Sequence, residues 1–232
     1  MCYSPKASIL SYSLGTILSI LCFFITTNKY YKHISLFVLC FTQIQLAEYF
    51  LWNNQTCNKI NKYITITIEA LLYLQPLVIF ISGYFLKTFT FSNKILFGLI
   101  GLCLLPYLDM LHYYSTTKDK ICSLQHKQTG HLKWAFKHKQ NLNTIAFLKD
   151  KLKWVVYTIF IVGNWLFLKD KIIALITFFV GVVSFFYSKF TIQNKYGKLK
   201  IKGISGGNSN WCYIAVYLSI GLLFCVLKDK FY

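Results

Sequence analysis

The sequence contains no arginine, although its formal net charge is +18 at pH 7. Arginine is the side chain that forms bidentate hydrogen bonds with guanine edges and phosphates, so its absence argues against nucleic-acid binding. The lysines flank apolar runs, a position in which anionic lipid headgroups attract them. We therefore expect a lipid bilayer as the partner and no nucleic acid.

Charged residues of either sign are scarce, at 14% of the 232 residues, whereas 56% are hydrophobic and 19% are aromatic. With a mean hydropathy of +0.48, this composition excludes both a disordered chain and a water-soluble domain with one core. The chain has only three prolines. Its longest polar connection, 115–153, is too short to bury a core of its own. We expect a single transmembrane domain over 1–232.

Apolar runs of membrane-spanning length organise the chain. There are seven of them: about 7–27, 34–52, 63–86, 95–114, 154–168, 172–187 and 210–227. The first lacks a small-residue cleavage pattern, so we expect it to be retained. Lys169-Asp170-Lys171 allows only a hairpin between two spans, or a re-entrant pair. The prediction is an all-α, polytopic bundle of about seven transmembrane helices. Lys, Asn, Ile, Phe and Tyr are in excess, and their A/T-rich codons indicate an A+T-rich coding genome. We therefore expect a virus or a protist as the source and a viral or host cell membrane as the location.

Seven spans place the N-terminus and the even-numbered connections on one side, called side A, and the rest on side B. Side A then holds 17 lysines and side B holds 8. The positive-inside rule therefore places side A in the cytosol. The excess of lysines on side A comes entirely from the connection 115–153. The glycosylation acceptor pattern Asn54-Gln55-Thr56 on side A stands against this orientation, because it functions only in a lumen. Such tripeptides arise often by chance in a chain rich in Asn and Thr, so the prediction stays a cytosolic side A.

The chain has eight cysteines, and most of them lie in apolar runs as small buried residues. Cys57 and Cys122 lie instead in polar connections on the same side. A disulfide between them is compatible with the sequence but is not required by it.

Three of the seven acidic residues, Glu48, Glu69 and Asp109, lie inside apolar runs. Ionisable groups there are costly and are functional candidates by default. Measured from the ends of the runs, all three lie roughly 7–9 Å below side A, at a rise of about 1.5 Å per residue. The sequence therefore predicts one polar pocket open to side A.

Other side chains are expected at or near that pocket. Helical spacing places Gln45, Glu48 and Trp52 on one face and Asp109 with His112 on another. The remaining candidate binding residues on side A are His131, Trp211 and Cys212. Cys2 and His112 are candidate catalytic residues.

Simpler interpretations are open for the same residues. Each carboxyl group could merely hold helices together through hydrogen bonds, and the tryptophans at run ends are typical of interfacial belts. The set Cys122, His126, His131 and His138 fits no zinc spacing, so no metal site is predicted. The sequence indicates no particular cofactor.

Four stretches carry a resemblance. They are MCYSPKAS at the start, Gln45-Leu46-Ala47-Glu48 with Trp52, Gly130-His131-Leu132-Lys133-Trp134, and Ser209-Asn210-Trp211-Cys212-Tyr213-Ile214-Ala215 with Ser219. They resemble the motifs of an uncharacterised family of multi-pass membrane proteins from bacteria, giant viruses and microbial eukaryotes, whose start is MCFS-x-x-AS. Tyr49, Trp134 and Val216 depart from its pattern. The resemblance implies a role for Cys2, Glu48, His131, Trp211 and Cys212 but brings no established activity.

Three functions fit these observations. The polar residues could bind or pass a small solute, ion or proton. The chain could instead be a membrane-embedded enzyme acting on a lipid or amphiphile, with Cys2 as nucleophile and Glu48, His112 or His131 in proton transfer or metal binding. Alternatively, it could be a structural or interaction protein whose polar groups lock the bundle.

Overall fold

The computed structural model describes residues 4–117, 121–125, 132–134, 155–196 and 211–231, with the backbone alone at 133, 184–196 and 211–215. The fold is all-α, apart from one short two-stranded sheet. Its elements are α1 (Pro5–Ile25), α2 (Lys29–Trp52), α3 (Lys59–Phe85), α4 (Asn93–Thr116), β1 (Leu124–Gln125), β2 (Leu132–Lys133), a helical stretch over Val155–Phe167 that ends in η1 (Gly163–Phe167), α6 (Lys171–Tyr196) and α7 (Trp211–Phe231).

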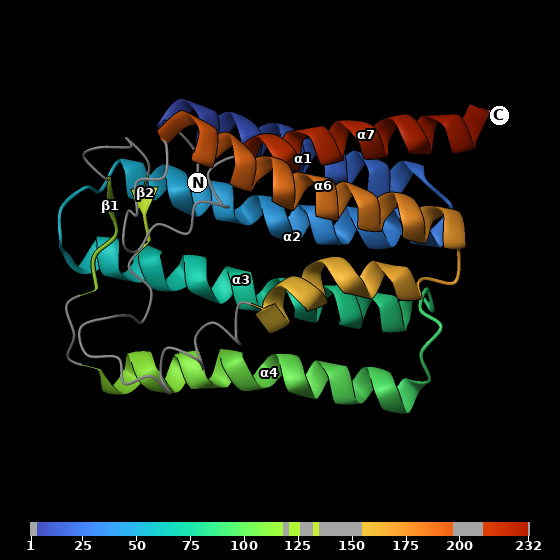
Figure 1. Ribbon diagram of the computed structural model, residues 1–232, viewed down its shortest axis with the longest axis horizontal. Coiled ribbons are helices and arrows are strands. Elements are labelled where there is room, and N and C mark those ends of the chain that lie inside the picture. Colours follow the sequence, from blue (N-terminus) through green and yellow to red (C-terminus); the bar gives the residue numbers. More distant parts are fainter. Residues whose placement is uncertain (1–3, 118–120, 126–131, 135–154, 197–210, 232) are drawn as a thin grey trace.

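The helices lie side by side along the long axis of the molecule, with the marked chain ends at opposite ends of the bundle (Figure 1). Each of the seven predicted runs coincides with a helical segment. Four helices, α1 to α4, are long and apolar enough to cross a membrane, and two shorter apolar stretches cover Val155–Phe167 and Lys171–Val183. The count of seven spans itself stays a prediction.

Helix starts follow local sequence. Side-chain oxygens of the N-cap residues accept hydrogen bonds from backbone N–H groups that the first helical turn leaves without partners. These pairs are Ser4 with Ala7, Asn28 with Tyr30 and Asn58 with Asn61. Because these caps lie ahead of the apolar runs, α1, α2 and α3 each begin a few residues before the run that they contain.

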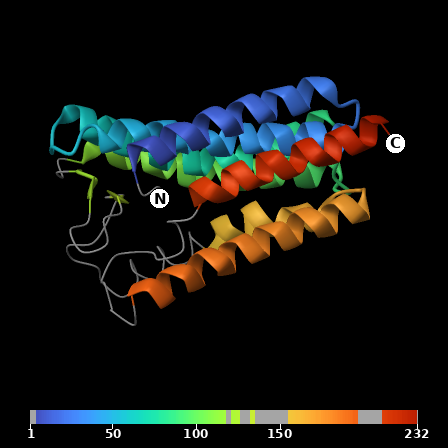
Figure 2. The ribbon, with the colours of Figure 1, turned by 90° about the horizontal axis from the view of Figure 1, so that it is seen from above.

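Helix α2 is the centre of the bundle, packed against α1, α3 and α7. Helix α4 packs on the far side of α3, and most of its surface is exposed. Helix α6 packs mainly on η1, and both lie off one side of the α1–α4 group (Figure 2). Apolar side chains that remain exposed are therefore concentrated on the outer helices, as expected for surfaces that face lipid.

The buried face of α1 consists of small residues, namely Ser8, Ser11, Gly15, Ser19 and Cys22. Small side chains let two helix backbones approach closely, which is how helices associate where lipid removes the hydrophobic driving force. At Gly15 a Cβ atom would overlap the methyl group of Thr42 on α2, and it would lie 3.5 Å from Ser219 Oγ on α7. Gly15 therefore sets the distance between these three helices.

At the end of the bundle that contains the C-terminus, two connections are joined by backbone pairing. The Thr90 N–H donates to the Phe167 carbonyl at 2.9 Å, and the Lys169 N–H donates to the Thr88 carbonyl at 2.9 Å. We call residues 86–92 and 167–170 the side B junction. It attaches η1 and α6 to the α3–α4 hairpin.

His33 of α2 anchors this junction from within. Its side chain is fully buried, with Nε2 at 2.9 Å from the Ile79 carbonyl and Nδ1 at 2.8 Å from Thr88 Oγ1. Because a carbonyl can only accept, Nε2 carries the proton, and Nδ1 of the neutral ring accepts from the Thr88 hydroxyl. The ring of Phe89 contacts the His33 ring edge-to-face at a centroid distance of 5.2 Å.

We predict that Gly83→Ala destabilises the bundle. A Cβ atom at Gly83 would overlap the Phe89 ring and lie 3.1 Å from His33 Cε1, in a site where neither ring has room to move. Overpacking of this kind costs about 1–3 kcal/mol. Thermal unfolding of the purified protein in detergent should show a lower midpoint. Gly101→Ala is the matched control, because nothing lies within 4 Å of that position. Equal midpoints for the two variants would contradict the prediction.

Candidate functional site

The stripe predicted on α2 lies largely inside the bundle. Gln45 is 3% exposed and Glu48 is fully buried. Trp52, one turn further on, is half-buried and its indole Nε1 has no hydrogen-bond partner within the described part of the chain. A carboxyl group in such surroundings is costly to ionise unless neighbouring groups compensate it. Glu48 is therefore the most deeply enclosed acidic residue among those that the structure describes.

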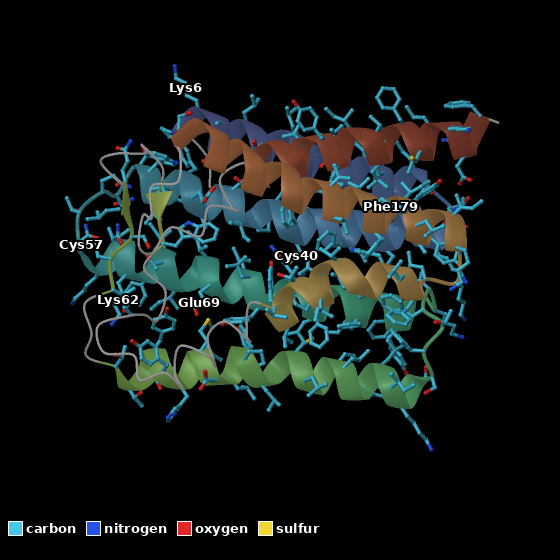
Figure 3. The ribbon with its side chains drawn as sticks, viewed as in Figure 1. Lys6, Cys40, Cys57, Lys62, Glu69 and Phe179 are labelled. Carbon is cyan, nitrogen blue, oxygen red and sulfur yellow. A yellow bond between two sulfur atoms is a disulfide. The ribbon has the colours of Figure 1, made fainter. Side chains whose placement is uncertain are left out.

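Glu69 of α3 is also buried, but it faces a different neighbour. Its Oε2 accepts a hydrogen bond from the hydroxyl group of Tyr114 on α4. The side chain accordingly extends from α3 toward α4 in Figure 3. This bond satisfies the carboxyl group and ties the two helices together near side A.

Asp109 and His112 take a different position. Both are exposed on α4, whose buried side is formed by Leu96, Cys103 and Met110. The structure thus buries two of the three acidic residues that lie in the apolar runs and leaves the third on an outer face. The equal depth expected from the sequence does not by itself bring side chains together. Two residues at the same depth meet only if each helix is rotated about its axis so that they face each other.

Four predicted site residues cannot be placed. Cys2 and His131 lie outside the described residues. Trp211 and Cys212 begin α7, but their side chains are also outside the described part of the structure. Their roles stay predictions. His126 and His138, for which no metal site was predicted, also lie outside the described residues.

Over the side A ends of α2 and α3 lies a small covalently attached element. We call residues 121–125 and 132–134 the side A cap. Within it, β1 pairs antiparallel with β2 and contacts α2. A disulfide joins Cys122 of the cap to Cys57 in the α2–α3 connection, with a Cα–Cα distance of 5.2 Å. The pairing that the sequence left open is therefore present.

Asn61 supplies the polar half of the same attachment. Its Oδ1 accepts from the Ser123 N–H at 2.9 Å, and its Nδ2 donates to the Ser123 carbonyl at 2.8 Å. Nδ2 also donates to the Asn54 carbonyl at 2.6 Å. One buried amide thus pairs with Ser123 as a neighbouring strand would and also holds the end of α2. On the apolar side, the fully buried Leu132 belongs to the main core.

Sequence reasoning missed a polar contact in the middle of the bundle. The hydroxyl group of Tyr157 donates to Gln75 Oε1 of α3, and both side chains are buried. Gln75 Nε2 has no hydrogen-bond partner within the described residues. The sequence did contain a signal for this contact, namely the amide side chain of Gln75 inside an apolar run, directly before Pro76. Asn61 and His33 were missed because they lie where polar connections begin.

No group of three or more His, Cys, Asp or Glu residues in the described part of the chain could hold a metal ion. Comparison of the chain with protein-family models, curated proteins and solved structures finds no match. The family resemblance drawn from the sequence motifs therefore stays a prediction. What the structure establishes is an all-α bundle with apolar helices of membrane-spanning length.

We predict that Asn61→Ala loosens the side A cap. The change removes the three hydrogen bonds that join the amide to Ser123 and Asn54, each of which contributes about 0.5–1.5 kcal/mol. The thermal midpoint in detergent should fall even with the disulfide intact. Asn53→Ala is the control, since its amide makes an exposed bond to the Tyr49 carbonyl. A midpoint unchanged from that control would refute the anchoring role of Asn61.

Proposed function

We propose that the chain is a polytopic integral membrane protein that binds or passes a proton or small cation at Glu48. The observation that carries the proposal is the complete burial of this carboxyl group on α2, the central helix of an apolar bundle. Evolution rarely retains so costly a group in a membrane helix unless it is used, and proton relays and cation pathways are its common uses.

The surroundings of Glu48 support a cation rather than an anion as the ligand. Gln45 lies one turn away on the same helix and is also buried, so its amide can contribute an oxygen ligand or orient the carboxyl group. Glu48 lies only four residues from Trp52, the last residue of α2, or about 6 Å along the helix axis. Little more than one helical turn therefore separates the carboxyl group from the side A end of α2.

Glu69 fits a structural role better than a second transport site. Its hydrogen bond from Tyr114 gives it a partner on the neighbouring helix, which accounts for its burial by helix association. We therefore assign bundle locking to Glu69 and keep Glu48, the more deeply buried of the two carboxyl groups, as the proposed binding group. No described contact supports an enzymatic role.

We predict that Glu48→Gln abolishes proton flux while leaving the fold intact. The amide keeps the size of the side chain and can still form hydrogen bonds, but it cannot take up and release a proton or balance the charge of a cation. The purified chain would be reconstituted into vesicles containing a pH-sensitive dye, with a potassium diffusion potential as the driving force. Flux in Glu48→Gln should fall to that of protein-free vesicles.

Asp229→Asn is the matched control, because it removes a carboxyl group from the exposed end of α7. It should retain the flux of the unmodified chain. The proposal fails if Glu48→Gln conducts as well as this control, or if the unmodified chain conducts no better than protein-free vesicles. Circular dichroism of each variant separates loss of flux from loss of helix.

A further inference from the structure

The described cysteines fall into two groups by position. Cys22, Cys40, Cys103 and Cys225 lie within helices and are free thiols. Cys57 and Cys122 lie in connections outside the helices, and they are bonded to each other. The pairing therefore involves the two described cysteines that lie outside the helices, at one end of the bundle.

That end is identified by three neighbouring features. The N-terminal end of α1, the α2–α3 connection and the cap strands all lie at the end of the molecule opposite the C-terminus (Figure 1). The disulfide thus belongs to side A. Disulfides persist in secretory, periplasmic or extracellular environments and are rare where glutathione and thioredoxin keep thiols reduced.

From this placement we infer that side A faces an oxidising compartment and that side B, with the C-terminus, faces the reducing cytosol. The inference is independent of the proposed function at Glu48. It assigns to the side A cap the role of a fixed cover on the exoplasmic face, attached both by the disulfide and by Asn61. It also means that a proton or cation reaching Glu48 from side A comes from outside the cytosol.

This orientation reverses the one that the total lysine count favours. The excess on side A comes from the single connection 115–153, and without it each side holds eight lysines. Side B lysines instead flank the helix ends in each of its short connections, as with Lys29, Lys87 and Lys169. The positive-inside rule also counts lysines in a connection as short as 115–153. The lysine tally therefore opposes this assignment, and the disulfide is the observation that carries it.

A second sequence feature agrees with the assignment. The acceptor tripeptide Asn54-Gln55-Thr56 immediately precedes Cys57, so it lies on the same side as the disulfide. Asn54 Nδ2 donates at 2.8 Å to the Phe50 carbonyl, an exposed bond within the end of α2. Such an acceptor has meaning only on the luminal face of a membrane. Glycosylation of Asn54 itself is not required by the inference.

Two reporter tags test the orientation. An Asn-Ser-Thr acceptor in a flexible linker would be added before Met1 in one variant and after Tyr232 in the other, both in the Asn54→Gln background. The full-length variants would be expressed in cells with a secretory pathway and treated with an endoglycosidase. The tag before Met1 should be glycosylated and the tag after Tyr232 should not. Any modification of the second tag, or none of the first, would overturn the inference.

The redox state of the cysteines gives an independent readout in the same membranes. After denaturation, a polyethylene glycol maleimide adds a countable mass to every free thiol. Prior reduction should add two labels to the Asn54→Gln chain and none to its Cys57→Ser/Cys122→Ser derivative. If reduction adds no label, the disulfide does not form in the membrane and the inference falls.

Discussion

Polar groups on an apolar helix must find their partners inside the bundle, and the arrangement of this protein follows from that constraint. His33 meets a carbonyl and a hydroxyl group, Glu69 meets a phenol, and Asn61 meets the backbone of Ser123. Each of these bonds joins two segments that apolar packing alone would leave free to rotate or slide. The helices supply length and lipid-facing surface, and the polar contacts determine which faces meet.

Two polar junctions therefore hold the two ends of the bundle, and they differ in kind. The side B junction consists of backbone pairing stabilised by an imidazole and an aromatic ring. The side A cap adds a covalent bond and one amide that makes three hydrogen bonds to Ser123 and Asn54. Glu48 lies between these ends on α2, the helix with the most extensive packing, so its surroundings are held from both directions.

Apolar length predicted the helices well, because a run long enough to cross a membrane has few alternatives to an α-helix. The Lys169-Asp170-Lys171 hairpin was also predictable. Asp170 begins α6 by accepting from the N–H groups of Ile172 and Ile173, each at 3.0 Å. The partners of polar residues were not predictable. His33 pairs with Thr88 across 55 positions, and Asn61 with Ser123 across 62, and sequence spacing carries no signal over such separations.

At the candidate site, too, the sequence predicted positions along a helix but not the partners that its side chains meet. Helical periodicity correctly placed Gln45 and Glu48 together on a buried face. Asp109 was expected beside them on depth alone, but the rotation of α4 is set by Leu96, Cys103 and Met110, which turn Asp109 outward. Rotation depends on packing partners, and those come from helices elsewhere in the chain.

The disulfide has a topological consequence for the chain between its two cysteines. Cys57 precedes α3 and Cys122 follows α4, so the bond closes a covalent ring that contains both helices. A ring closed on one side of a membrane must contain an even number of crossings. Helices α3 and α4 therefore cross as a pair or not at all, so the oxidised bond excludes a state in which only one of them has crossed. A cut within 86–92 would leave the two helices in one covalent molecule.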